Sequence, residues 1–154
     1  MTTITQLGPR ATPRGNYVLL TADTLHLLLP QHEVGAAEYL EGTLEAAGQP
    51  GLMKVRGAEG GRRFAALSAE MTLLPQCPPG RFLVTPLGGG NDGLGWCWNE
   101  LQILIDVELA FQPLPEVLLT ADAPVTHYVE LEGRLAYLCS AQQVSALASG
   151  PGAE

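Results

Sequence analysis

Apolar residues dominate two short neighbouring segments near the start of the chain. Residues 17–21 and 25–29 are rich in leucine and valine and flank the connection Ala22-Asp23-Thr24. Two apolar runs on either side of such a short connection predict a β-hairpin. The second run ends at Leu29-Pro30, and Val34 then begins a weaker extended or turn segment. The chain is therefore expected to open with a β-ribbon.

The next part of the chain carries mixed signals. Leu40 and Leu44 lie four residues apart among good helix formers, so residues 38–47 are expected to form a short helix. Residues 68–74 are expected to form one helical turn before prolines at 75–79 break the pattern, which predicts a boundary between two lobes. Two further segments are predicted strands: residues 52–55 and 63–67.

A second set of strands follows the prolines. Within it, Trp96 and Trp98 are expected on one face of a strand and Cys97 on the other, because side chains alternate along a strand. The predicted strands are residues 81–87, a long bent run over 94–109, 125–131 and 135–138.

The chain is expected to close with a short helix over residues 140–148. Ser140 can cap this helix, and Gln143 completes a capping box. Residues 1–15 and 149–154 are expected to be flexible ends, since prolines and glycines interrupt any ladder or helix there. Two sets of short strands with little helix predict a mostly-β protein built from small barrels.

Composition supports short elements and many turns. The 154 residues include 18 glycines and 12 prolines, more than a helical bundle or a coiled coil tolerates. A hydrophobic fraction of 46 % excludes a disordered chain. The formal net charge is -8, and residues 78–154 carry nine acidic and two basic residues, which disfavours nucleic acid and anionic membrane as partners. The one basic cluster, Arg56, Arg62 and Arg63, fits a solvated turn or a binding role.

Cysteine use and the N-terminus indicate a compartment. Cys77, Cys97 and Cys139 lie far apart without CxxC spacing, so free, reduced thiols are expected. Residues 1–8 lack the charged and apolar regions of a signal peptide, and no run of apolar residues is long enough to span a membrane. A soluble cytoplasmic protein is the resulting expectation.

The motifs that carry chemistry give little support for an enzyme. Gly88, Gly90 and Gly93 satisfy G-x-G-x-x-G, but a strand pattern follows them, and hairpin chemistry explains them. The three histidines and three cysteines show no tight ligand spacing, so no metal and no cofactor are expected. The two tryptophans are expected to pack in the core or between the lobes. Four carboxylates are expected to mark a solvated face: Asp106, Glu108, Glu130 and Glu132.

The order of the segments resembles the CheW-like domain family. In that family the first hairpin ends in Leu-Pro followed shortly by a valine, as Leu29-Pro30 and Val34 do here. Residues 51–57 are similar to the family segment that ends in Asn-Leu-Arg-Gly. Arg56 and Gly57 match, while Lys54-Val55 replaces the two residues before them.

The resemblance continues in the second half of the chain. Residues 81–84, the glycine turn and residues 94–101 resemble the family block ending in Gly-Leu-x-Val-Asp-x-Val, with Asn99 where Asp is usual. Residues 131–138 resemble its Leu-x-Gly-Arg-Leu strand pair. The chain departs from the family in a shortened stretch at 41–50, in an added turn at 58–62, and in His127 where glycine is common.

Membership would imply a single domain over residues 16–148, made of two five-stranded SH3-like β-barrel lobes with a few short helices. It would also imply a non-catalytic adaptor that couples the regulatory domain of a histidine kinase to the cytoplasmic tip of chemoreceptors, in chemotaxis or in twitching motility. The matched partner-binding positions are Val34, Arg56 and Gly57. The planar guanidinium of Arg56 would reach acceptors on the partner, and Gly57 would permit a turn that a side chain would obstruct.

Two other classes of function stay open. The first is a small-ligand-binding protein or an enzyme that uses a cleft between the lobes, lined by Trp96, Trp98 and the carboxylates. The second is a structural subunit that keeps the fold and oligomerises.

Overall fold

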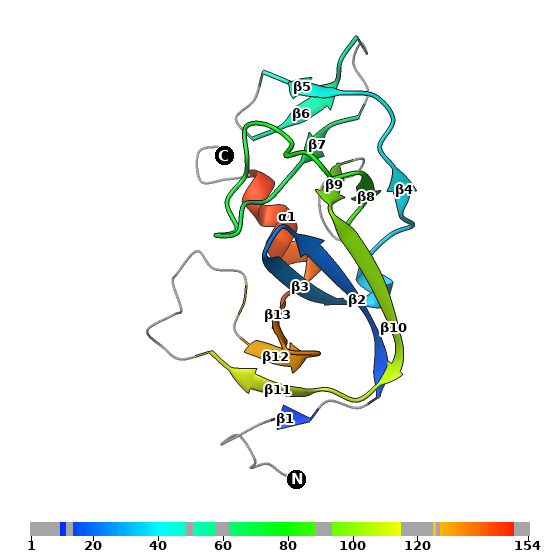
Figure 1. Ribbon diagram of the computed structural model, residues 1–154, viewed down its shortest axis with the longest axis vertical. Helices are drawn as coiled ribbons and strands as arrows, with labels where there is room; N and C mark the ends of the chain where they lie inside the picture. Colours follow the sequence, from blue (N-terminus) through cyan, green and yellow to red (C-terminus); the bar gives the residue numbers. More distant parts are fainter. Residues whose placement is uncertain are drawn as a thin grey trace.

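The computed structural model describes residues 10–11, 14–48, 51–57, 62–88, 94–114, 125 and 127–149. Among these residues the protein is mostly β, as predicted, and its strands form two sheets, one above the other in Figure 1. A 3-10 turn, η1 (Gln31–Glu33), and one helix, α1 (Ala141–Ser149), accompany them. The strands are β1 (Arg10–Ala11), β2 (Gly15–Ala22), β3 (Leu25–Pro30), β4 (Glu38–Tyr39), β5 (Leu44–Ala46), β6 (Met53–Val55), β7 (Phe64–Ala65), β8 (Leu83–Thr85), β9 (Gly95–Trp98), β10 (Glu100–Val107), β11 (Ala110–Pro113), β12 (His127–Leu131) and β13 (Arg134–Leu138).

The seven-stranded sheet, here called lobe 1, has the strand order β1-β11-β12-β13-β3-β2-β10. Only two residues separate β10 from β11, so they act as one bent strand (Figure 1). β10 pairs with β2 and β11 pairs with β12. Because β10 and β11 are continuous through the bend, the sheet closes on itself. Counted in this way lobe 1 is a small barrel of five strands, as predicted. β1 lies inside the expected flexible end at residues 1–15 but pairs with β11 at the sheet edge.

The six-stranded sheet, here called lobe 2, has the order β4-β8-β9-β7-β6-β5 and repeats this design. The backbone between β4 and β5 keeps pairing, since Leu40 N donates to Phe82 O at 2.7 Å and Arg56 N donates to Thr43 O at 2.6 Å. Gly42 supplies the bend with a φ of 98°, a conformation that glycine adopts without strain. β4 pairs with β8 and β5 pairs with β6, so lobe 2 is again a five-stranded ring.

The predicted lobe boundary at residues 75–79 is wrong. Lobe 2 takes all its strands from residues 38–98, on both sides of the prolines, and lobe 1 takes its strands from both ends of the chain. The chain crosses between the lobes after β3 and again at Asn99, between β9 and β10. Apolar runs show which segments are strands, but they do not show which strand each one pairs with.

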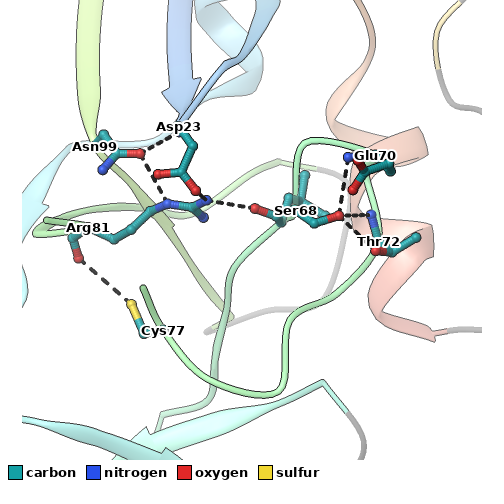
Figure 2. Close-up of polar contacts among 8 residues, drawn as sticks. Asp23, Ser68, Glu70, Thr72, Cys77, Arg81 and Asn99 are labelled. Carbon is teal, nitrogen blue, oxygen red and sulfur yellow. Dashed lines mark hydrogen bonds and ion pairs between the residues drawn. The ribbon is translucent and has the colours of Figure 1, made fainter. Parts of the chain in front are cut away.

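Two predicted helical segments are also wrong. Residues 38–47 form β4, β5 and the bend between them, because a spacing of four fits a strand as well as a helix, and Leu40 and Leu44 both pack on the lobe 2 interior. Residues 68–74 form a tight loop closed by a bridge between Leu67 and Leu73. Its polar groups are satisfied by the Ser68 hydroxyl, which accepts from the backbone N–H of two loop residues (Figure 2).

Several sequence predictions lie outside the described residues. These are most of the N-terminal end, at 1–9 and 12–13, most of the glycine turn, at 89–93, most of the added turn, at 58–61, and nearly all of the C-terminal end, at 150–154.

The apolar core consists of three clusters, one inside each lobe and one between the lobes. The lobe 1 interior contains Leu19, Leu28, Leu109, Phe111, Val129 and Ala136. The lobe 2 interior contains Met53, Phe64, Ala66, Val84 and Cys97. The largest cluster, here called the central core, joins both lobes and α1 and contains Val18, Leu20, Ala22, Leu25, Leu27, Leu29, Ala65, Leu67, Leu87, Leu94, Trp96, Trp98, Val125, Cys139, Ala141 and Val144.

The alternation predicted along β9 is confirmed. Trp96 and Trp98 point into the central core, whereas Cys97 points into the lobe 2 interior. Both indole rings are buried, and Trp98 Nε1 donates to Thr85 Oγ1 at 2.9 Å, which satisfies its polar edge. The predicted packing role of the tryptophans between the lobes is therefore also confirmed.

The closing helix is confirmed with its cap. The Ser140 hydroxyl accepts from Gln143 N at 3.1 Å, and Gln143 Oε1 accepts from Ser140 N at 3.2 Å, the reciprocal pattern of a capping box. Glu33 Oε1 accepts from Ala141 N at 2.8 Å, so η1 is tied to the first turn of α1.

A buried arginine, Arg81, donates the hydrogen bonds that connect the segments at the junction between the lobes. Arg81 is 1 % exposed, and its Nη2 donates to Asp23 Oδ2 at 2.9 Å and to Leu67 O at 2.8 Å. Asn99 Oδ1 accepts from Arg81 Nε at 3.1 Å and from Asp23 N at 2.6 Å (Figure 2). These bonds join the turn between β2 and β3, the loop after β7 and the crossing point between β9 and β10.

Replacing Arg81 is expected to destabilise the protein strongly. Arg81→Met leaves the Leu67 carbonyl without its donor and Asp23 without its cation, and should lower the free energy of unfolding by about 3 kcal/mol. Arg134→Met is the matched control: Arg134 is exposed, lies 3.8 Å from Glu132, and should change stability by less than about 0.5 kcal/mol. Urea denaturation of both variants measures this, and equal losses would contradict the role given to Arg81.

Candidate protein-interaction surface

Val34 lies where the chain leaves lobe 1. Its N–H donates to Gln31 O at 3.1 Å, and Val34 forms an isolated bridge with Leu87. The side chain is half-buried and packs against the central core. The next residue, Gly35, donates to Pro86 O at 2.8 Å. The backbone around Val34 is therefore fixed against lobe 2.

Arg56 and Gly57 form the exposed turn that follows β6. Gly57 has a φ of 86°, and a Cβ built on it would meet no atom of the described residues within 4 Å. Any side chain would be strained in this left-handed backbone, so the turn favours glycine. Arg56 Nε lies 3.5 Å from Glu45 Oε1, and the other oxygen of that carboxylate lies 3.9 Å from Lys54 Nζ.

An exposed segment connects these two positions. Residues 35–43, here called the β4 ribbon, run along one side of lobe 2 from the end of η1 to β5 (Figure 1). All of them are exposed except Leu40, which packs on the lobe 2 interior. Tyr39 is 75 % exposed, and Phe82, beside the ribbon, is 59 % exposed. Aromatic side chains are enriched at protein–protein interfaces, so these two residues are candidates for contact with a partner.

A hollow of about 420 Å³ lies against β4. Its lining residues are Glu38, Tyr39, Leu40, Glu41, Arg62, Phe64 and Val84. Arg62 Nη1 lies 2.6 Å from Glu38 Oε2, and the guanidinium carbon is 5.4 Å from the Phe64 ring centroid. The lining therefore combines one ion pair with the apolar side chains of Leu40, Phe64 and Val84.

The residues proposed to line a ligand cleft do not form one. Trp96 and Trp98 are buried in the central core, which fills the space between the lobes at that point. Asp106 and Glu108 are both paired with Arg14, at 3.1 and 3.8 Å. Trp96 and Trp98 therefore do not line the cleft that was expected for an enzyme or a ligand-binding protein.

His26, on β3, is a half-exposed strand residue. Its Nδ1 lies 3.1 Å from Thr21 Oγ1 on the neighbouring strand. Burial, with a smaller contribution from Arg134, lowers the pKa of His26 below its ordinary value. In the described part of the chain, no three histidine, cysteine, aspartate or glutamate side chains gather as a metal site.

Comparisons with known proteins add no relative. The sequence matches no protein-family model, and a search of the curated proteins finds no match either. Within the described ranges no helix is long and apolar enough to cross a membrane. The β4 ribbon and its two ends are therefore a candidate site on their geometry alone.

Sequence analysis singled out Val34, Arg56 and Gly57 and named Arg62 in the basic cluster, but it did not single out Tyr39 or Phe82. Residues 38–47 were expected to be helical, and Phe82 was counted as a strand residue. Gly42 was the available signal, since glycine at this position favours a bend over a helix.

The two phenylalanines near the β4 ribbon should differ sharply in their effect on stability. Phe64→Ala removes a 6 % exposed ring from the lobe 2 interior and should lower the free energy of unfolding by about 3 to 5 kcal/mol. Phe82→Ala removes a ring that is mostly in solvent and should change stability by less than about 0.5 kcal/mol. Thermal or urea denaturation of both variants decides this, and a large loss for Phe82→Ala would show that Phe82 belongs to the core and not to a free surface.

Proposed function

We propose that this protein is a CheW-like, non-catalytic adaptor of the cytoplasm that couples the regulatory domain of a histidine kinase to the cytoplasmic tip of chemoreceptors. The observation that carries the proposal is the pair of five-stranded lobes around one central core, with the exposed β4 ribbon running between the positions that resemble the family's binding residues. The pathway would be chemotaxis or a related system such as twitching motility.

The fold supports an adaptor because it offers a rigid body with an exposed edge. The β4 ribbon is held at one end by Gly35 N on Pro86 O and at the other by Arg56 N on Thr43 O. Between these anchors all its residues except Leu40 are exposed. A partner that binds such a fixed segment has little backbone entropy to remove, which favours affinity.

Arg56 is the residue best placed to bind an acidic group of the partner. Its side chain is 71 % exposed, and its 3.5 Å contact with Glu45 is an exposed ion pair, which contributes little to stability. Arg56 can therefore exchange Glu45 for a carboxylate or a carbonyl of a partner. The guanidinium offers several donors in one plane, so it can bind two acceptor atoms at once.

Asn99, where the family usually has Asp, does not weaken the proposal. In this chain Asn99 receives hydrogen bonds from Arg81 and from Asp23 N, and its own N–H donates to Thr21 O at 2.7 Å. An aspartate could accept the same two bonds with one oxygen. The position serves the junction between the lobes and lies outside the proposed binding surface.

Paired capture experiments test the adaptor function. Wild type, Arg56→Glu and Arg134→Glu are used as baits in lysate of the native organism, and recovered proteins are identified by mass spectrometry. Wild type and Arg134→Glu should recover a histidine kinase or a chemoreceptor, and Arg56→Glu should recover at least about tenfold less, as expected when a charge pair at an interface becomes repulsive.

Arg134→Glu makes the same change of charge at an exposed arginine of lobe 1, so it controls for general electrostatic effects. All three baits must show the same thermal unfolding midpoint before binding is compared. Recovery of no kinase or chemoreceptor by wild type would contradict the adaptor function. Equal recovery by Arg56→Glu would contradict the assigned surface.

A further inference from the structure

Two of the three cysteines, Cys77 and Cys97, lie at the lobe 2 interior. Cys77 lies in the loop between the Ser68–Thr72 turn and β8, where it is partly exposed and packs against the lobe 2 interior. Cys97 lies on β9 and belongs to that interior. The two thiols lie close enough that each shifts the pKa of the other. The Cys77 thiol donates to Arg81 O at 4.0 Å (Figure 2).

We propose that Cys77 and Cys97 form a peroxide-oxidisable dithiol, in which partly exposed Cys77 is the attacked cysteine and buried Cys97 resolves it into an intramolecular disulfide. The two cysteines differ in their exposure to solvent, and this difference assigns their roles. An oxidant reaches Cys77 from solvent, and Cys97 is the neighbouring sulfur that can take over the bond.

The surroundings make Cys77 the more reactive of the two thiols. The hydrogen bond from the Cys97 thiol and the nearby Arg81 guanidinium lower the pKa of Cys77 to about 7, although burial acts in the opposite direction. The same contact, together with burial, raises the pKa of Cys97. Thiolates and not thiols attack oxidants, so Cys77 reacts first.

The reaction balances with hydrogen peroxide as the oxidant. The Cys77 thiolate attacks one peroxide oxygen, the O–O bond breaks, and hydroxide leaves, giving a sulfenic acid on Cys77. The Cys97 sulfur then attacks the Cys77 sulfur, the S–O bond breaks, and the hydroxyl leaves as water with the thiol proton. In sum, two thiols are oxidised to one disulfide and one peroxide is reduced to two waters.

Cys139 provides an internal control. It is buried in the central core, away from the lobe 2 interior, and burial raises its pKa. A buried cysteine with no thiolate character should stay reduced under conditions that oxidise Cys77.

Peptide mapping of the full chain tests the proposal. The native protein is treated with hydrogen peroxide, remaining thiols are blocked with iodoacetamide, and unreduced digests are analysed by mass spectrometry. Wild type and Cys139→Ser should give a peptide pair linked through Cys77 and Cys97. In Cys97→Ser, Cys77 should remain as a sulfenic acid that dimedone traps, and in Cys77→Ser, Cys97 should stay a free thiol.

The pH dependence of Cys77 alkylation is a second readout that requires no variant. In the folded protein the rate should have its midpoint near pH 7, and in the urea-unfolded chain it should have the ordinary higher midpoint of a cysteine. Wild type that oxidises at Cys77 while Cys97 stays free would overturn the dithiol. Equal midpoints in the folded and unfolded protein, or oxidation of Cys139 at the rate of Cys77, would overturn the assignment of Cys77 as the reactive residue.

Discussion

Strands β2, β3, β7 and β9 are each buried on both faces, and this double burial fixes how the two lobes meet. Along β2, Leu19 points into lobe 1 while Leu20 points into the central core. Along β9, Cys97 points into lobe 2 while Trp96 points into the central core. A shift of register by one residue would exchange these faces and place the wrong side chains in each cluster, so the central core constrains both barrels at once.

The junction between the lobes is polar at one edge and apolar in its middle. Arg81 ties Asp23, Leu67 O and Asn99 together where the chain passes from β9 to β10. α1 covers the central core from another side through Ala141 and Val144. With the junction held in this way, the β4 ribbon is carried on a rigid body, and its exposed residues keep a fixed spacing to the Arg56–Gly57 turn. A fixed surface of this kind is suited to binding a partner.

The sequence predicted the elements whose signal is local. The hairpin of β2 and β3, the alternation of Trp96 and Cys97, and the capping box of Ser140 each depend on residues within a few positions of one another. The pairing of strands far apart in the chain was not predictable, and so the lobe boundary was misplaced at the prolines. The segment around Leu40 and Leu44 was ambiguous, because a period of four fits two kinds of structure. The same error concealed Tyr39, since a helix would not have left the β4 ribbon open along lobe 2. Val34, Arg56 and Gly57 stay predictions as partner-binding residues, and the structure adds the exposed segment that connects them.

Under the proposed function, a signalling partner binds along the β4 ribbon and the Arg56–Gly57 turn. Hydrogen–deuterium exchange, measured by mass spectrometry with and without the kinase domain or receptor fragment recovered from the native organism, tests it most directly. Binding there should slow exchange in peptides that cover residues 35–46 and 53–57 and leave exchange in β12 and β13 unchanged. Slower exchange confined to β12 and β13, with the β4 ribbon unaffected, would contradict it.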